Sequence, residues 1–274
     1  MKHHKVFGRS LSGFELDGDN SRSGCGLPHG LRKQIDVIER GLGKLVITET
    51  ATSDQPPRVI LVGHSNPKYD AADGIRIVGG ICLFPTVTHI AKSKNGRKFS
   101  LLLRFPSSAA VLAFLARFLT SWIPSGLLKA VLRAFMGFPT DAAVTTTAFI
   151  KNRWGVAQAL QMTRDEMVAI RSDVWDTEIW GAAHQSPSPH PRPKLRFLFS
   201  QNDHWVADET RDDLIRARTF GDDHDGSGGS GIQRTEHWKP RMEDANFIQS
   251  SVPIAERVKI YVEDIVNSDM DRNL

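Results

Sequence analysis

The chain has 274 residues, a net charge of +4, and hydrophobic and charged contents of 40% and 24%, which exclude a disordered or fibrous protein. This length suits one large domain, or a domain that carries a cap. The two cysteines, Cys25 and Cys82, are too few for a disulfide framework. This low cysteine count favours a reducing compartment over secretion. No apolar run follows the N-terminal residues to form a signal peptide.

Strands and helices alternate along the predicted chain. Apolar residues at helical spacing predict an amphipathic helix over Leu31–Val46, although Gly41 and Gly43 weaken its end. Three apolar runs predict strands, and two later segments predict helices. In chain order these are Val59–Val62, Ile75–Leu83, Leu195–Phe199, about Asp208–Arg218 and Ile254–Val266. This order favours an α/β protein with a mostly parallel sheet and helices on both faces.

Polar stretches rich in glycine, proline or serine predict two surface loops, at Ser186–Pro193 and Gly221–Gly231. No internal repeat is present.

The segment Leu101–Phe138 is apolar and basic. It contains two helical stretches, about Ser107–Leu119 and Gly126–Met136, on either side of a corner at Trp122-Ile123-Pro124. Charged residues and prolines interrupt it too often for a membrane-spanning helix. Two interpretations stay open and are compatible: a hairpin that lies in a lipid interface, and a cap that packs its apolar face on the core.

Basic residues predominate in and around this segment. No acidic residue occurs between Asp73 and Asp141, whereas the same stretch contains Arg76, Lys92, Lys94, Arg97, Lys98, Arg104, Arg117, Lys129 and Arg133. Such a distribution favours an anionic partner, either phospholipid head groups or nucleic acid. Because no zinc-ligand spacing, basic repeat or aromatic RNA motif accompanies it, we expect a lipid surface and no nucleic acid. We also predict no metal and no cofactor.

Ser65 is the candidate nucleophile. It follows the strand Val59–Val62 within Gly63-His64-Ser65, where glycine permits the sharp turn of a nucleophile elbow. Pro67 stands where a second small residue is usual, and Asn66–Gly74 is too short for the helix that normally follows an elbow. An ordinary turn at the end of a strand is the alternative interpretation.

Asp203 and His237 are the candidates for the other two members of a catalytic triad. Asp203 comes directly after the strand Leu195–Phe199, where carboxyl ends of parallel strands converge on an active site. His237 is the last histidine of the chain, and its neighbours predict a polar loop. A solvated, non-catalytic histidine is the alternative for His237 and for His204.

Several of these segments together resemble the lipid-droplet-associated hydrolase family. They are Val59–Ser65, Leu83-Phe84-Pro85-Thr86 followed by Ser93-Lys94-Asn95-Gly96, the acid segment Ser200–Val206, and Gly8–Phe14 with Gly30–Ile35 before the elbow strand. The resemblance runs with gaps from about Val6 to Val266. It implies an α/β-hydrolase fold, Ser65 as nucleophile, Asp203 as orienting acid, and an acyl ester or neutral lipid as substrate. It also implies attachment to the cytoplasmic face of a lipid droplet through Leu101–Phe138, with the endoplasmic reticulum as a second membrane.

On this basis we expect three parts: residues 1–98 with the elbow, a helical cap or lipid-interface segment at 99–190, and residues 191–274 with the acid segment and the last helix. Against the family pattern, the first strand and the post-elbow helix are expected to be missing, and Ala245 stands where a histidine is usual. Three interpretations stay open: an active esterase or lipid hydrolase, a catalytically impaired lipid-droplet-binding protein, and an incomplete chain.

Overall fold

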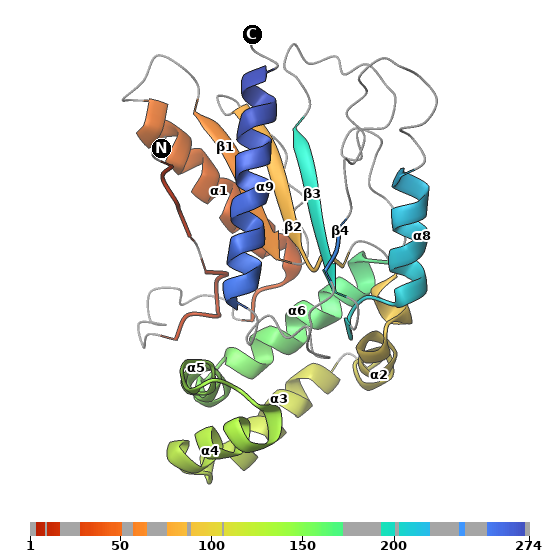
Figure 1. Ribbon diagram of the computed structural model, residues 1–274. Helices are drawn as coiled ribbons and strands as arrows, with labels where there is room; N and C mark the ends of the chain where they lie inside the picture. Colours follow the sequence, from red (N-terminus) through yellow and green to blue (C-terminus); the bar gives the residue numbers. More distant parts are fainter. Residues whose placement is uncertain are drawn as a thin grey trace. The chain divides into compact units, whose positions relative to one another are not determined.

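A computed structural model describes residues 4–8, 10–16, 28–50, 57–64, 76–86, 89–105, 107–171, 193–200, 203–219, 236–238 and 251–271 (Figure 1). The chain divides into two compact units. The first, here called the helical unit, comprises Met1–Leu45 and Leu101–Glu166. The second, the sheet unit, comprises Val46–Ser100 and Met167–Leu274. The two predicted loops lie outside the described residues, apart from Pro193.

A small parallel sheet organises the sheet unit. Its four strands follow one another in the order β1 (Arg58–His64), β2 (Arg76–Leu83), β3 (Lys194–Ser200) and β4 (Glu236–Trp238), and every neighbouring pair is parallel. The first three coincide with the predicted strands. The described chain is otherwise mostly helical, which is compatible with the predicted α/β class.

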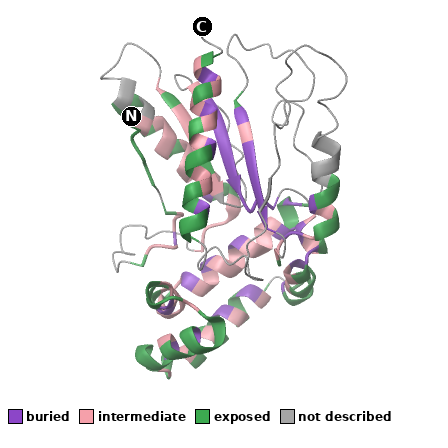
Figure 2. Ribbon diagram, in the orientation of Figure 1, coloured by how far each residue is buried: buried purple, intermediate pink, exposed green. Residues whose placement is uncertain are grey.

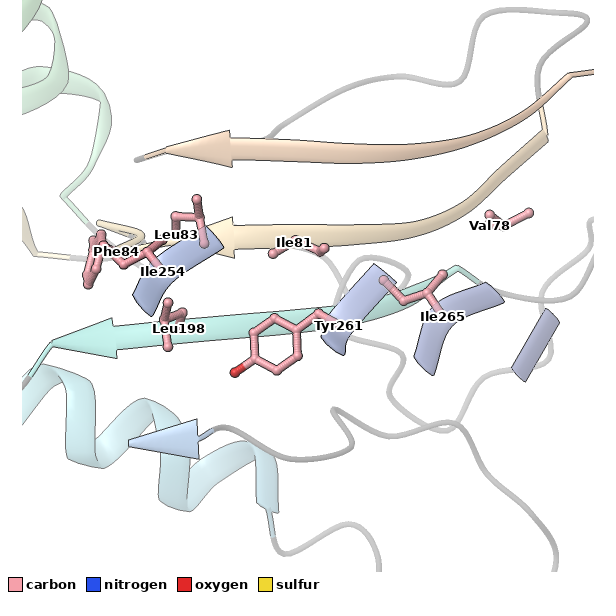
Figure 3. Packing of buried hydrophobic residues seen from close by; sticks show 8 residues of the cluster. All are labelled: Val78, Ile81, Leu83, Phe84, Leu198, Ile254, Tyr261 and Ile265. Carbon is pink, nitrogen blue, oxygen red and sulfur yellow. The ribbon is translucent and has the colours of Figure 1, made fainter. Parts of the chain in front are cut away.

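One face of the sheet is covered by the last helix, α9 (Ser251–Asp271). Figure 3 shows side chains of β2 and β3, including Ile81 and Leu198, packed against Tyr261 and Ile265 of α9. Gly79 allows this approach, because a Cβ at that position would lie 2.5 Å from Cγ2 of Ile265. The strands β2 and β3 are accordingly almost wholly buried (Figure 2).

Ion pairs join the same helix to the amino-terminal halves of the strands. Asp264 accepts hydrogen bonds from Lys194 Nζ at 2.9 Å and from Arg196 Nε at 2.8 Å. Asp269 pairs with Arg58 and, at 2.7 Å, with Arg76. These contacts leave the carboxyl ends of the strands to form the candidate site.

The helical unit contains α3 (Ser108–Ser121), α4 (Ser125–Met136), α5 (Thr140–Lys151), most of α6 (Gly155–Ala169) and the start of α1 (Leu31–Thr50). The prediction of α1 is confirmed, and this helix continues through both of its glycines. The predicted helices of the apolar segment are confirmed as α3 and α4. In the sheet unit, α8 (Asp208–Thr219) and α9 match their predictions, with α9 a few residues longer at each end.

Two buried glutamines hold the N-terminal segments within the helical unit. Gln34 donates to the Ser12 carbonyl at 2.6 Å and accepts from the Ser12 N–H at 2.9 Å. Gln158 does the same with His29, at 2.6 and 2.7 Å. Each side-chain amide therefore makes two hydrogen bonds to one residue's backbone, as a neighbouring strand does. These bonds satisfy the backbone N–H and C=O groups of Ser12 and His29 away from water.

Candidate functional site

The candidate site is the edge at which β1, β2, β3 and β4 end. Ser65 comes one residue after the end of β1 but lies outside the described residues. The same is true of Asn66–Gly74, the segment that contains Pro67. The structure therefore places the strand that leads to Ser65 but not its side chain. β1 runs beside β2 with Gly63 opposite Cys82 and His64 opposite Leu83.

Asp203 lies three residues beyond the end of β3. Its side chain is half-buried, and Oδ1 accepts a hydrogen bond from the Trp205 N–H at 2.7 Å. The Trp205 ring in turn stacks on Phe99, with ring centroids 5.4 Å apart. The aspartate is thus held by its own turn, and that turn is anchored by packing to α2 (Lys94–Leu102).

His237 belongs to β4, so the prediction of a polar loop around it is wrong. The strand pairs in parallel with the end of β3, where His237 lies opposite Phe199 and Trp238 opposite Ser200. A three-residue edge strand carries too few residues for an alternating pattern, which is why the sequence did not indicate it. The backbone brings the segments of His237 and Asp203 to the ends of adjacent strands.

The segment after β2 holds two residues in the left-handed region, Phe84 with φ 47° and His89 with φ 51°. Non-glycine residues are uncommon there and cost about 1–3 kcal/mol each, and such strain clusters at functional sites. The sequence did not single out His89. No pattern marked it, because its position depends on the backbone of the turn rather than on spacing.

A tight turn follows at Ser93–Gly96. Ser93 Oγ donates to the Ile90 carbonyl at 2.7 Å and accepts from the Gly96 N–H at 2.9 Å, which caps the start of α2. Glycine is required at position 96, because a Cβ there would lie 1.9 Å from the Ile90 oxygen. The Asn95 N–H then donates to the carbonyl of His204 at 3.0 Å. This turn therefore touches the acid segment directly.

Cys82, which lies in β2 near this edge, is unreactive. Burial raises the pKa of the Cys82 thiol to about 12, so this cysteine packs as a small apolar side chain. Within the residues that the structure describes, no three His, Cys, Asp or Glu side chains are grouped to hold a metal ion.

Residues 1–226 match the family described as lipid-droplet associated hydrolase. The chain belongs to that family. No solved structure matches it. The matched range contains Ser65, Asp203 and His89, whereas His237 lies beyond it.

Membership of this family implies association with lipid droplets and a lipid substrate. Many large apolar side chains of the segment Leu101–Phe138 are exposed, and Figure 2 shows α4 largely in the exposed colour. In the described part of the chain, no single helix has the length and apolar content to cross a membrane. α3 and α4 meet those criteria only as a pair, and they are bent by 110° at the break between them.

Proposed function

We propose that this chain is a serine ester hydrolase that acts on acyl esters or neutral lipids at the surface of a lipid droplet. The observation that carries this proposal is the sheet edge. Ser65 follows β1, Asp203 follows β3, and His237 lies in β4 beside the end of β3. Nucleophile, acid and base of an α/β hydrolase all come from the carboxyl ends of parallel strands.

In this reaction Ser65 Oγ attacks the acyl carbonyl carbon while His237 accepts the serine proton. Asp203 orients the imidazole and stabilises its charged form. The imidazolium then protonates the leaving alkoxide, and the acyl-enzyme is hydrolysed by a water molecule that the same histidine deprotonates. Two backbone N–H groups near the elbow would bind the oxyanion, and each such donor contributes about 10²–10³ in rate.

Attachment to the lipid is proposed for the exposed part of Leu101–Phe138. The exposed apolar positions include Phe114 and Phe118 on α3 and Trp122 directly after it, which recur at helical spacing, and Phe135 on α4. Trp122 and Phe135 are 77% and 86% exposed. We place this surface on the cytoplasmic face of the droplet, with the endoplasmic reticulum membrane as a second location.

The test is labelling by a fluorophosphonate probe together with hydrolysis of a soluble ester. We expect Ser65→Ala to abolish both, and Ser125→Ala, at the exposed start of α4, to change neither. Among histidines, His237→Gln should reduce hydrolysis by several orders of magnitude, whereas His204→Gln and His89→Gln should not. If His237→Gln retained full activity and His89→Gln lost it, the base would have to be reassigned.

A second candidate function is lipid-surface binding without catalysis. The exposed apolar side chains favour it, because binding through α3 and α4 needs none of the triad. A folded protein that binds droplets and is not labelled by the probe would support this alternative and refute the hydrolase proposal.

A further inference from the structure

The feature that carries a further inference is the corner between α3 and α4. The helices contain 14 and 12 residues, about 21 and 18 Å of axis, and the hydrocarbon of a bilayer is about 30 Å thick. Neither helix crosses alone, and the 110° bend turns the second away from the path of the first. A pair that keeps this bend can enter only one leaflet.

The bend is held from outside the pair by Lys151, the last residue of α5. Its ammonium group donates to the carbonyl of Thr120 at 3.0 Å and to the carbonyl of Ile123 at 2.7 Å. The Thr120 carbonyl lies in the last turn of α3 and also accepts the Ile123 N–H at 3.3 Å, whereas the Ile123 carbonyl lies in the corner after the helix. The C-terminal end of a helix favours a positive charge such as this ammonium group. The same α5 packs Ala143 against Leu128 and Leu132 of α4. Both arms of the corner are therefore fixed to one helix.

The hydroxyl side chains of α3 donate to backbone carbonyls three or four residues earlier in the chain. Ser108, Thr120 and Ser121 donate their hydroxyls to the carbonyls of Phe105, Ala116 and Phe118 at 2.6–2.7 Å. A hydroxyl already paired costs much less to move out of water than a free one. The corner can therefore enter an apolar phase without stranding these donors.

The exposed side chains of the corner indicate the chemistry of the surface that it would enter. On α3, α4 and the corner between them the large exposed apolar residues are Val111, Phe114, Leu115, Phe118, Leu119, Trp122, Leu127, Val131, Phe135 and Met136. Exposed Arg104, Arg117 and Arg133 accompany them, and the sequence places no acidic residue between Asp73 and Asp141. Apolar side chains with a purely cationic margin complement a phospholipid surface that contains anionic head groups.

We propose that α3 and α4 form a preorganised wedge that enters a single leaflet of an anionic phospholipid surface, with Lys151 as the positioning residue that holds its bend. This rests on the lipid attachment proposed above and adds its geometry. Because the bend exists before binding, the chain does not lose the conformational entropy of forming it on the lipid. Lys151 contributes through the corner rather than by touching a head group.

The experiment uses the full chain and vesicles of phosphatidylcholine with phosphatidylserine. Spin labels are attached at Ala110→Cys on α3 and Ala134→Cys on α4, two exposed positions, in a Cys25→Ser background. Cys82 is buried with a pKa of about 12 and resists labelling. The label separation would be about 36 Å in a straight continuous helix, and roughly half of that with the bend. We expect the short distance in solution and no change on vesicles; a shift to the long distance would overturn the single-leaflet wedge.

Lys151→Met and Lys151→Arg test the positioning role, with vesicle flotation as the second readout. We expect Lys151→Met to broaden the distance distribution and weaken binding by roughly fivefold, and Lys151→Arg to restore both, because guanidinium also donates to two carbonyls. Trp122→Glu separates this inference from the attachment on which it rests. If Trp122→Glu bound like the wild type, the attachment itself would fail. If Trp122→Glu lost binding while Lys151→Met kept both distance and binding, only the role of Lys151 would be overturned.

Discussion

Replacement of Asp264 by asparagine tests what fixes α9 to the sheet. Lys194 and Arg196 point at this carboxylate from β3, and only 9% of each of their side chains is exposed. Removing one partner of a buried ion pair costs about 3–5 kcal/mol, because the other charge loses its compensation. Since 36% of the Asp264 side chain is exposed, and Lys194 keeps a hydrogen bond to Ser268, we reduce the expected loss to about 2 kcal/mol.

The pH dependence of this loss has a definite sign. Burial alone would raise the pKa of Asp264, but hydrogen bonds from Arg196 and Lys194 outweigh burial and lower it. A lowered pKa in the folded protein means that the charged form stabilises folding above the unfolded pKa of about 4. That stabilisation disappears as the pH falls through the folded pKa. The difference between the wild type and Asp264→Asn should therefore be full at pH 7 and shrink in acid below about pH 4.

Urea unfolding followed by far-UV circular dichroism measures both effects. The matched control is Glu263→Gln, the preceding residue on α9, whose carboxylate is 59% exposed and lies 4.0 Å from Lys259. An exposed helical pair of this kind contributes about 0.5 kcal/mol or less. Equal losses for the two variants at neutral pH, or a gap that did not narrow in acid, would refute the assignment of this ion pair as the attachment of α9.

Three further predictions follow from other contacts. In thermal unfolding, Gly96→Ala should lower stability by at least about 2 kcal/mol, because the added Cβ meets a backbone oxygen. Gly126→Ala should raise stability by up to about 1 kcal/mol, because a Cβ at this position of α4 meets open space. Equal effects of the two variants would contradict this reasoning. Burial and a neighbouring carboxylate raise the pKa of Glu166 to about 7, so stability should fall as the pH rises toward 7. Glu166→Gln should abolish that fall and gain about 2 kcal/mol at pH 8 in urea titrations, and an unchanged pH profile would contradict it. Phe135→Ser should weaken vesicle flotation roughly tenfold, or about 1–2 kcal/mol. Val252→Ser on α9, where the apolar side chain is also exposed, should not weaken it, and parallel losses would indicate non-specific adhesion.

The sequence predicted most of the sheet unit because burial leaves a strong local pattern. β1 and β2 contain continuous apolar runs, β3 is apolar at Leu195 and from Phe197 to Phe199, and α9 repeats apolar residues at the helical period. Each was therefore found near its true bounds. β4 was missed because it is stabilised by pairing with β3 rather than by its own three residues. In the helical unit, α5 and α6 were not predicted. Their buried positions include Thr147, Gln158 and Gly155, so the core side of each helix is not marked by apolar residues alone.

Prediction of the site was limited in a different way. Spacing along the chain led to Asp203 and to the strand before Ser65, because a parallel sheet puts strand ends together. Neither composition nor periodicity indicated the left-handed backbone of Phe84 and His89. Nor did they indicate the hydrogen bonds that Gln34 and Gln158 exchange with peptide groups. Such features depend on contacts between residues far apart in sequence.

Each of the two most distinctive segments of the family resemblance makes a backbone hydrogen bond to β3 or to the loop after it. Leu83–Thr86 and Ser93–Gly96 lie away from the nucleophile in sequence, yet the Asn95 N–H bonds to the His204 carbonyl, next to Asp203. The strained Phe84 is held from the same side, because its N–H donates to Leu198 of β3 at 2.8 Å. Both segments after β2 are thus hydrogen-bonded to β3 or to the loop that follows it. A triad acid must hold its histidine in one orientation, which requires a fixed loop. We therefore interpret this part of the family pattern as the frame of the acid loop rather than as a contact with substrate.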